Sequence, residues 1–143
     1  RSLALLFAAD RIDHGHNKLI PALRQGKYVV CDRYLWSSLA YQGRDIDFSW
    51  LETINKFACK PDLTIFIRVR PEVSLERITG SRLKTEIFEK LEILEEVYQN
   101  YIKIFKEWQN SGKKVVVIDG EQSKEKVTEE IKKVMADFLN RGQ

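Results

Sequence analysis

The chain has 143 residues, of which 43% are hydrophobic and 31% charged, a composition typical of a soluble globular protein and not of a disordered one. The 24 basic and 21 acidic residues leave a formal net charge of +3, too small a surplus to indicate a nucleic-acid partner. No apolar run approaches the roughly 20 residues that a bilayer requires. Two cysteines without CxxC spacing predict reduced thiols. We expect one cytoplasmic domain over residues 1–143, with no membrane partner.

The first part of the chain, residues 2–25, has a helical pattern of apolar residues. The pattern starts at once and without an initiator Met, so the beginning of the protein is expected to be missing. Gly15 and Pro21 are expected to interrupt the helix, and Gly26 to end it. Residues 28–31 then form a short apolar, β-branched run, which predicts a buried strand of a parallel sheet.

The middle of the chain alternates between helical and strand patterns. Residues 35–41 and 48–58 predict two helices, and residues 63–69 a strand that leads into a helix over 71–78. The apolar stripe expected on the helix over 48–58 consists of Leu51, Ile54, Phe57 and Ala58.

The last part of the chain starts with a basic segment, about 79–86, that resembles a lid. A long helix over 86–109, a strand over 114–118 and a helix from Ser123 follow. Strands that alternate with such helices predict an α/β doubly wound parallel sheet, flanked by helices and with a ligand crevice at the carboxyl ends of its strands. Three strands make a thin sheet, so a further strand is expected upstream.

A dense group of polar side chains follows the strand predicted at 28–31. Arg33 can fork onto phosphate oxygens, and Asp32 can meet a metal or an attacking oxygen. The alternative is a salt bridge at the end of the strand, with a serine cap and a core tyrosine nearby. The position after a buried strand favours the anion site.

Two weaker signals lie elsewhere. Phe7 and Arg11 are four residues apart on one helix face, where they could hold a flat ring by stacking and by a hydrogen bond to its edge. A core Phe and a solvated Arg are the alternative. In the lid region, Arg77, Arg82 and Lys84 could close over a polyphosphate or form a solvated basic loop.

Taken together, several motifs resemble those of the bacterial thymidylate kinases. They are LLFAADR (5–11), CDRY (31–34), SSLAYQG (37–43), the segment 69–78, FE (88–89) and VIDG (117–120). The resemblance implies a P-loop kinase fold, usually a homodimer. It also implies transfer of the γ-phosphoryl group of Mg·ATP to dTMP, which gives dTDP and ADP on the route to dTTP.

The resemblance also implies roles for individual residues. Those implied for dTMP are Phe7, Arg11, Arg33, Ser38, Tyr41 and Gln42. Phe7 would stack on thymine and Arg11 would bond its edge, with Ser38 and Gln42 close to the base. Arg33 would hold the acceptor phosphate. Tyr41 would lie against the sugar and leave little room for a ribose 2′-hydroxyl.

On the side of ATP, Asp32 would act near Mg²⁺ and the transferring phosphoryl group. The lid arginines Arg82 and Arg77 would neutralise charge during transfer, and Gly120 and Gln122 would border adenine. The implied catalytic set is therefore Asp32, Arg33 and Arg82.

The chain departs from the family pattern in two places. It holds no GxxxxGK[ST] sequence, whose backbone amides and lysine cradle the ATP phosphates, so the 143 residues by themselves are expected to be inactive. It also has Ile87 before Phe88, where the family commonly has Arg, so Arg82 or Lys84 would substitute.

Two other functions stay open. One is another P-loop kinase of nucleosides or nucleoside monophosphates, although deoxynucleoside kinases typically carry Glu-Arg-Ser where this chain has Asp32, Arg33 and Tyr34. The other is a catalytically inactive nucleotide-binding module.

Overall fold

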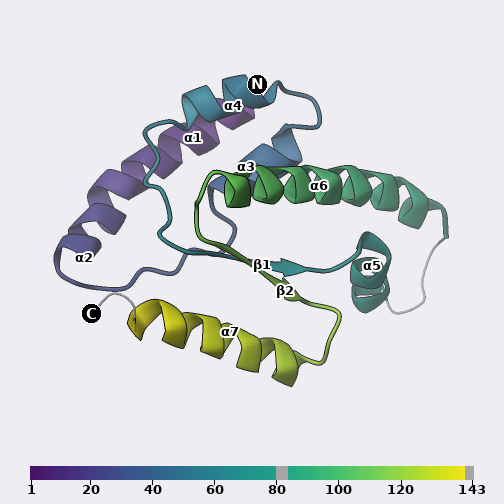
Figure 1. Cartoon of the computed structure of the whole chain (residues 1–143). Coiled ribbons are helices and arrows are strands. Elements are labelled where there is room, and N and C mark those ends of the chain that lie inside the picture. The colour runs from purple at the N-terminus through teal and green to yellow at the C-terminus, as the bar shows by residue number, and fades with distance from the viewer. Residues whose placement is uncertain (80–83, 141–143) are drawn as a thin grey trace. The chain divides into compact units, whose positions relative to one another are not determined.

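The computed structural model describes residues 1–79 and 84–140, of which residues 79 and 84–89 are described by their backbone alone. The described chain divides into two compact units, Arg1–Lys60 and Pro61–Gln143 (Figure 1). The expectation of a single domain remains a prediction. No helix in the described residues is long and apolar enough to cross a membrane.

The first unit consists of helices and loops. Its helical elements are α1 (Ser2–His14), the π-helical stretch η1 (Gly15–Leu19), α2 (Ile20–Arg24), α3 (Leu35–Gln42) and α4 (Phe48–Ile54). The helix predicted over residues 2–25 is therefore confirmed. Gly15 changes the helical hydrogen-bonding pattern without breaking the helix, and Pro21 lies in the first turn of α2, where a missing N–H costs little.

The core of the first unit lies where α1 packs against α3 and α4. On the α1 side, Ala4 and Ala8 are only 2% and 3% exposed, and their small side chains let the helices approach closely. The larger apolar side chains come from the other two helices, namely Leu35, Trp36, Leu39 and Leu51.

The strand predicted over residues 28–31 is wrong. These residues form a loop, in which Tyr28 is 74% and Val30 87% exposed. A strand exists only when a neighbour completes its hydrogen-bond ladder. In the described part of the chain the two strands pair with each other, and neither pairs with this segment. The β-branched pattern alone does not provide a partner.

The third predicted helix of the first unit, over residues 48–58, is shorter than expected. Its observed counterpart α4 ends at Ile54, and Phe57, placed on the buried stripe by its spacing, is 71% exposed. The ammonium of Lys56 lies 4.8 Å from the centroid of the Phe57 ring. Asn55 follows α4 directly, so the turn after it leaves the helical periodicity and carries Phe57 outward.

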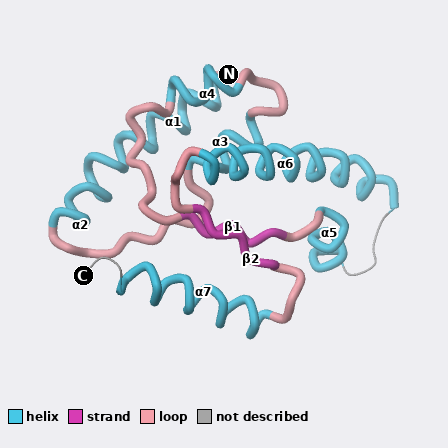
Figure 2. Tube along the Cα trace, in the orientation of Figure 1, coloured by secondary structure: helices cyan, strands magenta, loops and turns pink. Residues whose placement is uncertain are grey.

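The second unit is built on two parallel strands. Its elements are β1 (Thr64–Arg68), α5 (Pro71–Thr79), α6 (Lys84–Asn110), β2 (Val115–Asp119) and α7 (Lys124–Asn140). Figure 2 shows the two strands side by side, in a register that runs from Thr64 opposite Val115 to Arg68 opposite Asp119. The strands predicted over 63–69 and 114–118 are confirmed to within a residue or two. Residues 80–83 of the predicted lid lie outside the described residues.

Helices α6 and α7 cover opposite faces of this sheet (Figure 1). The Phe66 ring on β1 packs against two rings of α6, stacked on Tyr101 at a centroid distance of 5.6 Å and tilted against Phe105 at 4.6 Å. The next residue, Ile67, points to the other face, where it lines a cavity with Val127 of α7. This alternation is the normal two-residue period of a strand.

The structure therefore confirms an α/β fold with a parallel sheet, but not the larger doubly wound sheet that the sequence predicts. The described residues form a helix-rich α/β structure with two parallel strands joined through α5 and α6. The third expected strand is the loop at 28–31. Both observed strands end at the same edge of the sheet, and residues just beyond that edge, among them Gly120, form the candidate site of this unit.

Candidate functional site

Arg11 is the centre of a buried polar cluster in the first unit. Its guanidinium donates one hydrogen bond from Nη1 to the Asn55 Oδ1 and another from Nη2 to the Ser38 hydroxyl, at 2.6 Å. The guanidinium carbon also lies 5.5 Å from the centroid of the Tyr34 ring. Burial lowers the pKa of Arg11 from its ordinary value. All three hydrogen-bonding and stacking partners are neutral, so the cluster orients the positive charge without cancelling it.

Two buried polar atoms close to this cluster lack a hydrogen-bond partner in the described structure. They are the Tyr34 hydroxyl and the Gln42 Oε1. Gln42 comes one helical turn after Ser38 on α3, so the two side chains share a face. Burial raises the pKa of Tyr34 and keeps its hydroxyl protonated. Leaving such an atom unsatisfied costs about 1–3 kcal/mol, and a polar ligand would remove that cost.

Arg33 occupies a strained position just before α3. Its φ of +51° lies in the left-handed region, which a residue with a Cβ adopts at a cost. In this conformation the guanidinium carbon lies 4.8 Å from the centroid of the Tyr41 ring, and Nε donates to the Ser37 hydroxyl at 3.4 Å. The strained backbone therefore directs an exposed cation along one face of α3, which suits the capture of an anion.

Two further predicted residues lie on the surface of the same unit. The Phe7 side chain is 47% exposed on α1, one helical turn before Arg11, so a flat ring can reach its face. Asp32 is exposed in the loop immediately before Arg33. The predicted members of the dTMP site therefore gather around α1 and α3, with Arg11 bonded to Ser38 and Arg33 stacked on Tyr41.

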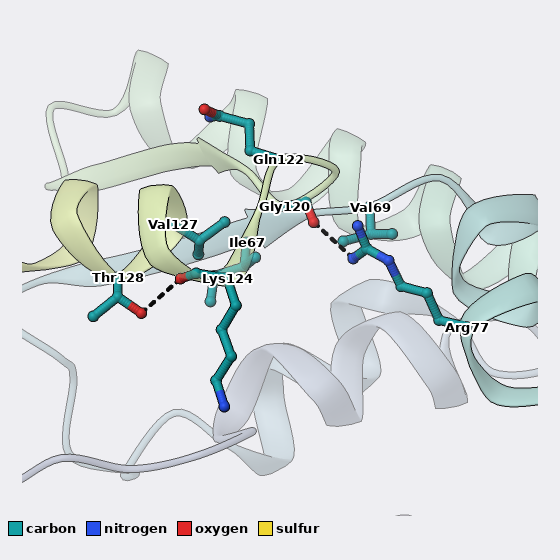
Figure 3. A pocket seen from close by; sticks show the side chains of 8 residues that line it. All are labelled: Ile67, Val69, Arg77, Gly120, Gln122, Lys124, Val127 and Thr128. Atoms are coloured by element: carbon teal, nitrogen blue, oxygen red, sulfur yellow. Dashed lines mark hydrogen bonds between the residues drawn. The ribbon is translucent and has the colours of Figure 1, made fainter.

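The second unit holds a cavity of about 480 Å³ on the α7 face of its sheet. Figure 3 shows the side chains that line it, Ile67, Val69, Arg77, Gly120, Gln122, Lys124, Val127 and Thr128. Arg77 donates to the main-chain oxygens of Gly120 at 2.7 Å and Glu121 at 3.2 Å. The structure thus brings the predicted residues Arg77, Gly120 and Gln122 together, with the Arg77 guanidinium bound to the loop after β2.

That loop has little room to change. A Cβ added to Gly120 would come within 2.6 Å of methyl groups of both Ile67 and Val69, so a side chain there would displace β1. The Arg70 guanidinium holds the Glu121 carboxylate by two parallel hydrogen bonds of 2.8 and 2.7 Å. This pairing lowers the pKa of Glu121 to about 2 and raises that of Arg70.

Some residues of these sites were not predicted. Asn55 gave one signal in the sequence, an amide directly after the apolar Ile54 in a predicted amphipathic helix. Tyr34 belongs to the CDRY motif, which does not indicate that its hydroxyl has no hydrogen-bond partner in the described structure. The pairing of Arg70 with Glu121 joins residues far apart in sequence, which no local pattern could indicate. Arg82 lies outside the described residues.

The described residues contain no group of three or more His, Cys, Asp or Glu side chains arranged to hold a metal. This is compatible with the predicted use of Mg²⁺, which proteins that act on nucleotides usually bind through one or two carboxylates plus the substrate phosphates and waters. Asp32, exposed beside Arg33, has the hard oxygen ligand that such an ion requires.

The exposed ring of Phe7, the oriented guanidinium of Arg11 and the exposed Arg33 lie around helices α1 and α3 of the first unit, an arrangement that suits a small ligand with a flat ring and an anionic group. Comparison with known families specifies the class further, because the model of the family described as thymidylate kinase matches residues 1–131. The chain belongs to the thymidylate kinase family.

Individual relatives come from both archaea and bacteria. The chain is 46% identical over 102 residues to a probable thymidylate kinase of Thermococcus gammatolerans. This match covers 71% of the chain and 49% of the relative. It is 36% identical over 137 residues to one of Staphylothermus marinus, with 95% and 66% covered. A thymidylate kinase of Oceanobacillus iheyensis is 37% identical over 148 residues, with 98% and 64% covered. The chain spans about half the length of the Thermococcus relatives.

Proposed function

We propose that the protein with this sequence is a thymidylate kinase, which transfers the γ-phosphoryl group of ATP to dTMP. Membership of the family supports this activity. The observation that carries it is the Arg11 cluster, in which an oriented cation shares one unit with two buried polar atoms that have no partner among the described residues. These groups need a flat ligand with polar edges, and a pyrimidine base is one.

Base recognition would fall to residues of α1 and α3. The remaining N–H groups of Arg11 would donate to a carbonyl oxygen of thymine, while the Phe7 ring stacks on its face. Gln42 and Ser38 would lie along the base edge. Because such a site leaves buried polar groups unpaired with the wrong base, it discriminates strongly.

The sugar and acceptor phosphate would lie beside Arg33 and Tyr41. The Arg33 guanidinium would fork onto the phosphate of dTMP, and the Tyr41 ring would occupy the space that a 2′-hydroxyl needs. In the transfer, an oxygen of this phosphate forms a bond to the γ-phosphorus while the bond to the β,γ-bridging oxygen breaks and ADP leaves. The attacking oxygen is already anionic near neutral pH, so positioning and charge neutralisation are the main needs.

Mg²⁺ would neutralise charge on the ATP phosphates. Asp32 would hold this ion, directly or through water, next to the acceptor phosphate on Arg33. Arg82 of the lid would add positive charge at the transferring group.

Adenine would bind in the cavity of the second unit, bordered by Gly120 and Gln122. Its apolar walls, Ile67 and Val127, suit the faces of a purine. Since the Arg77 guanidinium is bound to the carbonyl oxygens of the loop, it would act here by fixing that loop.

The proposal extends to the whole protein, for which we infer a P-loop kinase fold, a homodimer and a cytoplasmic location. The exposed apolar side chains of α1, such as Leu3 and Leu6 at 59% and 67%, offer surface for a second copy.

The test is a steady-state assay of ADP formation by the protein expressed from its complete reading frame, with dTMP, dUMP, UMP and dCMP as acceptors. We expect kcat/KM for dTMP to exceed that for UMP and dCMP by at least about 100-fold. Equal rates with UMP would reassign the protein to another nucleoside monophosphate kinase. No turnover with any acceptor would favour an inactive nucleotide-binding module.

A further inference from the structure

We propose that Asn55 positions Arg11 for recognition of the base and thereby contributes to the affinity for dTMP. The inference rests on the proposed function of the Arg11 site. It concerns a residue outside the motifs of the sequence analysis, located in the turn that follows α4.

The Asn55 side chain is fixed by burial and by a hydrogen bond to the main chain of α4. It is 1% exposed, and its Nδ2 donates to the main-chain oxygen of Leu51 at 2.8 Å. This bond fixes which end of the amide is the donor, so the Oδ1 end faces Arg11 and accepts from its Nη1. The acceptor for Arg11 is therefore set by the main chain of α4, and its position does not depend on a mobile side chain.

The cluster leaves Arg11 able to bind a ligand. An arginine side chain loses about 2 kcal/mol of rotamer entropy when it is ordered, and the bonds to Asn55 and Ser38 impose that order before any ligand arrives. In the described structure two of the five guanidinium donors bond Asn55 and Ser38, which leaves donors for a ligand. A carboxylate at position 55 would neutralise the charge and compete with the base, whereas an amide orients the guanidinium and leaves the charge in place.

A structural role alone makes a different prediction from a positioning role. If Asn55 only completed the turn after α4, its loss would lower stability and would weaken the protein whether or not Arg11 is present. If Asn55 acts through Arg11, its loss should affect dTMP and not ATP, and the effect should disappear when Arg11 is removed.

The experiment is a double-mutant cycle on the protein expressed from its complete reading frame. The variants are Asn55→Leu, Arg11→Met and the pair. Asn17→Leu is the matched control, because the exposed Asn17 side chain donates to Asp13, four residues earlier and away from the Arg11 cluster. The readouts are the Kd for dTMP by calorimetry, KM for each substrate, kcat, and Tm.

We expect Asn55→Leu to raise the Kd and KM for dTMP about tenfold, as for the loss of one charge-assisted hydrogen bond, with KM for ATP unchanged. In the Arg11→Met background the same change should add less than about twofold, and Asn17→Leu should match the wild type. An unchanged Kd, or an equal loss in both backgrounds, would overturn the inference.

If Asn55→Leu does not fold, Asn55→Ser repeats the test. A serine can still bond the Leu51 oxygen four residues earlier but is too short to reach Arg11, so the same tenfold rise in Kd is expected, and a wild-type Kd would overturn the inference. Wild-type protein that binds no dTMP would instead refute the proposed function.

Discussion

The polar groups of the two candidate sites are satisfied in different ways. In the first unit, Arg11 is oriented by neutral partners, and the buried Tyr34 hydroxyl and Gln42 Oε1 have no hydrogen-bond partner among the described residues. In the second unit, Arg77 is bound to carbonyl oxygens and Arg70 to a carboxylate. In the described structure the first site therefore keeps polar groups that a ligand can bind, whereas the arginines of the second unit are already bound to protein oxygens. We therefore expect the first site to discriminate between ligands and the second site to bind its ligand in a cavity that is already formed.

The largest effect is expected at the centre of the first site. Arg11→Met should weaken dTMP binding about 100-fold, because it removes the charged donors to the base and leaves the Asn55 Oδ1 without its partner. Calorimetric titration measures this change. Arg24→Met, at the exposed end of α2, is the matched control and should leave the Kd unchanged. A loss below about threefold would mean that Arg11 does not contact the ligand.

The next effect concerns the rigidity of the second site. Gly120→Ala should lower the free energy of unfolding by about 1–3 kcal/mol, because the added Cβ collides with Ile67 and Val69. Gly15→Ala is the control. Its added Cβ meets no heavy atom within 4 Å, and the helical backbone there favours alanine. Urea unfolding of both variants measures the difference, and equal stabilities would show that the loop after β2 can move.

A smaller effect, an increase in stability, is expected at Tyr34. Tyr34→Phe removes a buried hydroxyl that has no partner in the described part of the chain, so it should raise the free energy of unfolding of the unliganded protein by up to about 1 kcal/mol. The same change should weaken dTMP binding if the ligand bonds that hydroxyl. Tyr28→Phe, on a side chain that is 74% exposed, should change neither quantity. Destabilisation by Tyr34→Phe would mean that the hydroxyl is already satisfied.

The smallest effect is expected at the exposed pair of Arg70 and Glu121. The folded state lowers the Glu121 pKa from its ordinary 4.5 to about 2, so the pair stabilises the fold above about pH 4.5 and loses this contribution as the pH falls towards 2. Glu121→Gln should therefore have a lower Tm than the wild type at pH 7 and an equal Tm near pH 2. A difference in Tm that does not vary over this range would contradict the pairing.

Local pattern predicted much of the fold. The long helix α6, the helix from Ser2 to Arg24, and both observed strands follow from apolar periodicity and from Gly or Pro at their ends. The errors arose where a partner decides the outcome. Residues 28–31 have the composition of a strand, but no strand of the described structure pairs with them, and Phe57 has helical spacing beyond the point where α4 ends.

The candidate site divides in the same way. Motifs along the chain predicted Arg11, Ser38, Arg33 and Tyr41, and the structure brings them together as two contacting pairs. Asn55 was missed because its importance lies in a bond to Arg11, 44 residues earlier. The role of Arg77 also depends on a distant partner, since its bonds to the loop at Gly120 form only when α5 and β2 have packed together.

The most direct test of the central claim is a thermal-shift titration of the protein from its complete reading frame with dTMP, with UMP as the control. A ligand that binds only the folded state raises Tm, because it stabilises that state by RT ln(1 + [L]/Kd). The account predicts a clear rise with dTMP that grows with the logarithm of its concentration above Kd, and a much smaller rise with UMP at the same concentrations. Equal shifts with both nucleotides, or none with dTMP, would contradict a site built for thymidylate around Arg11.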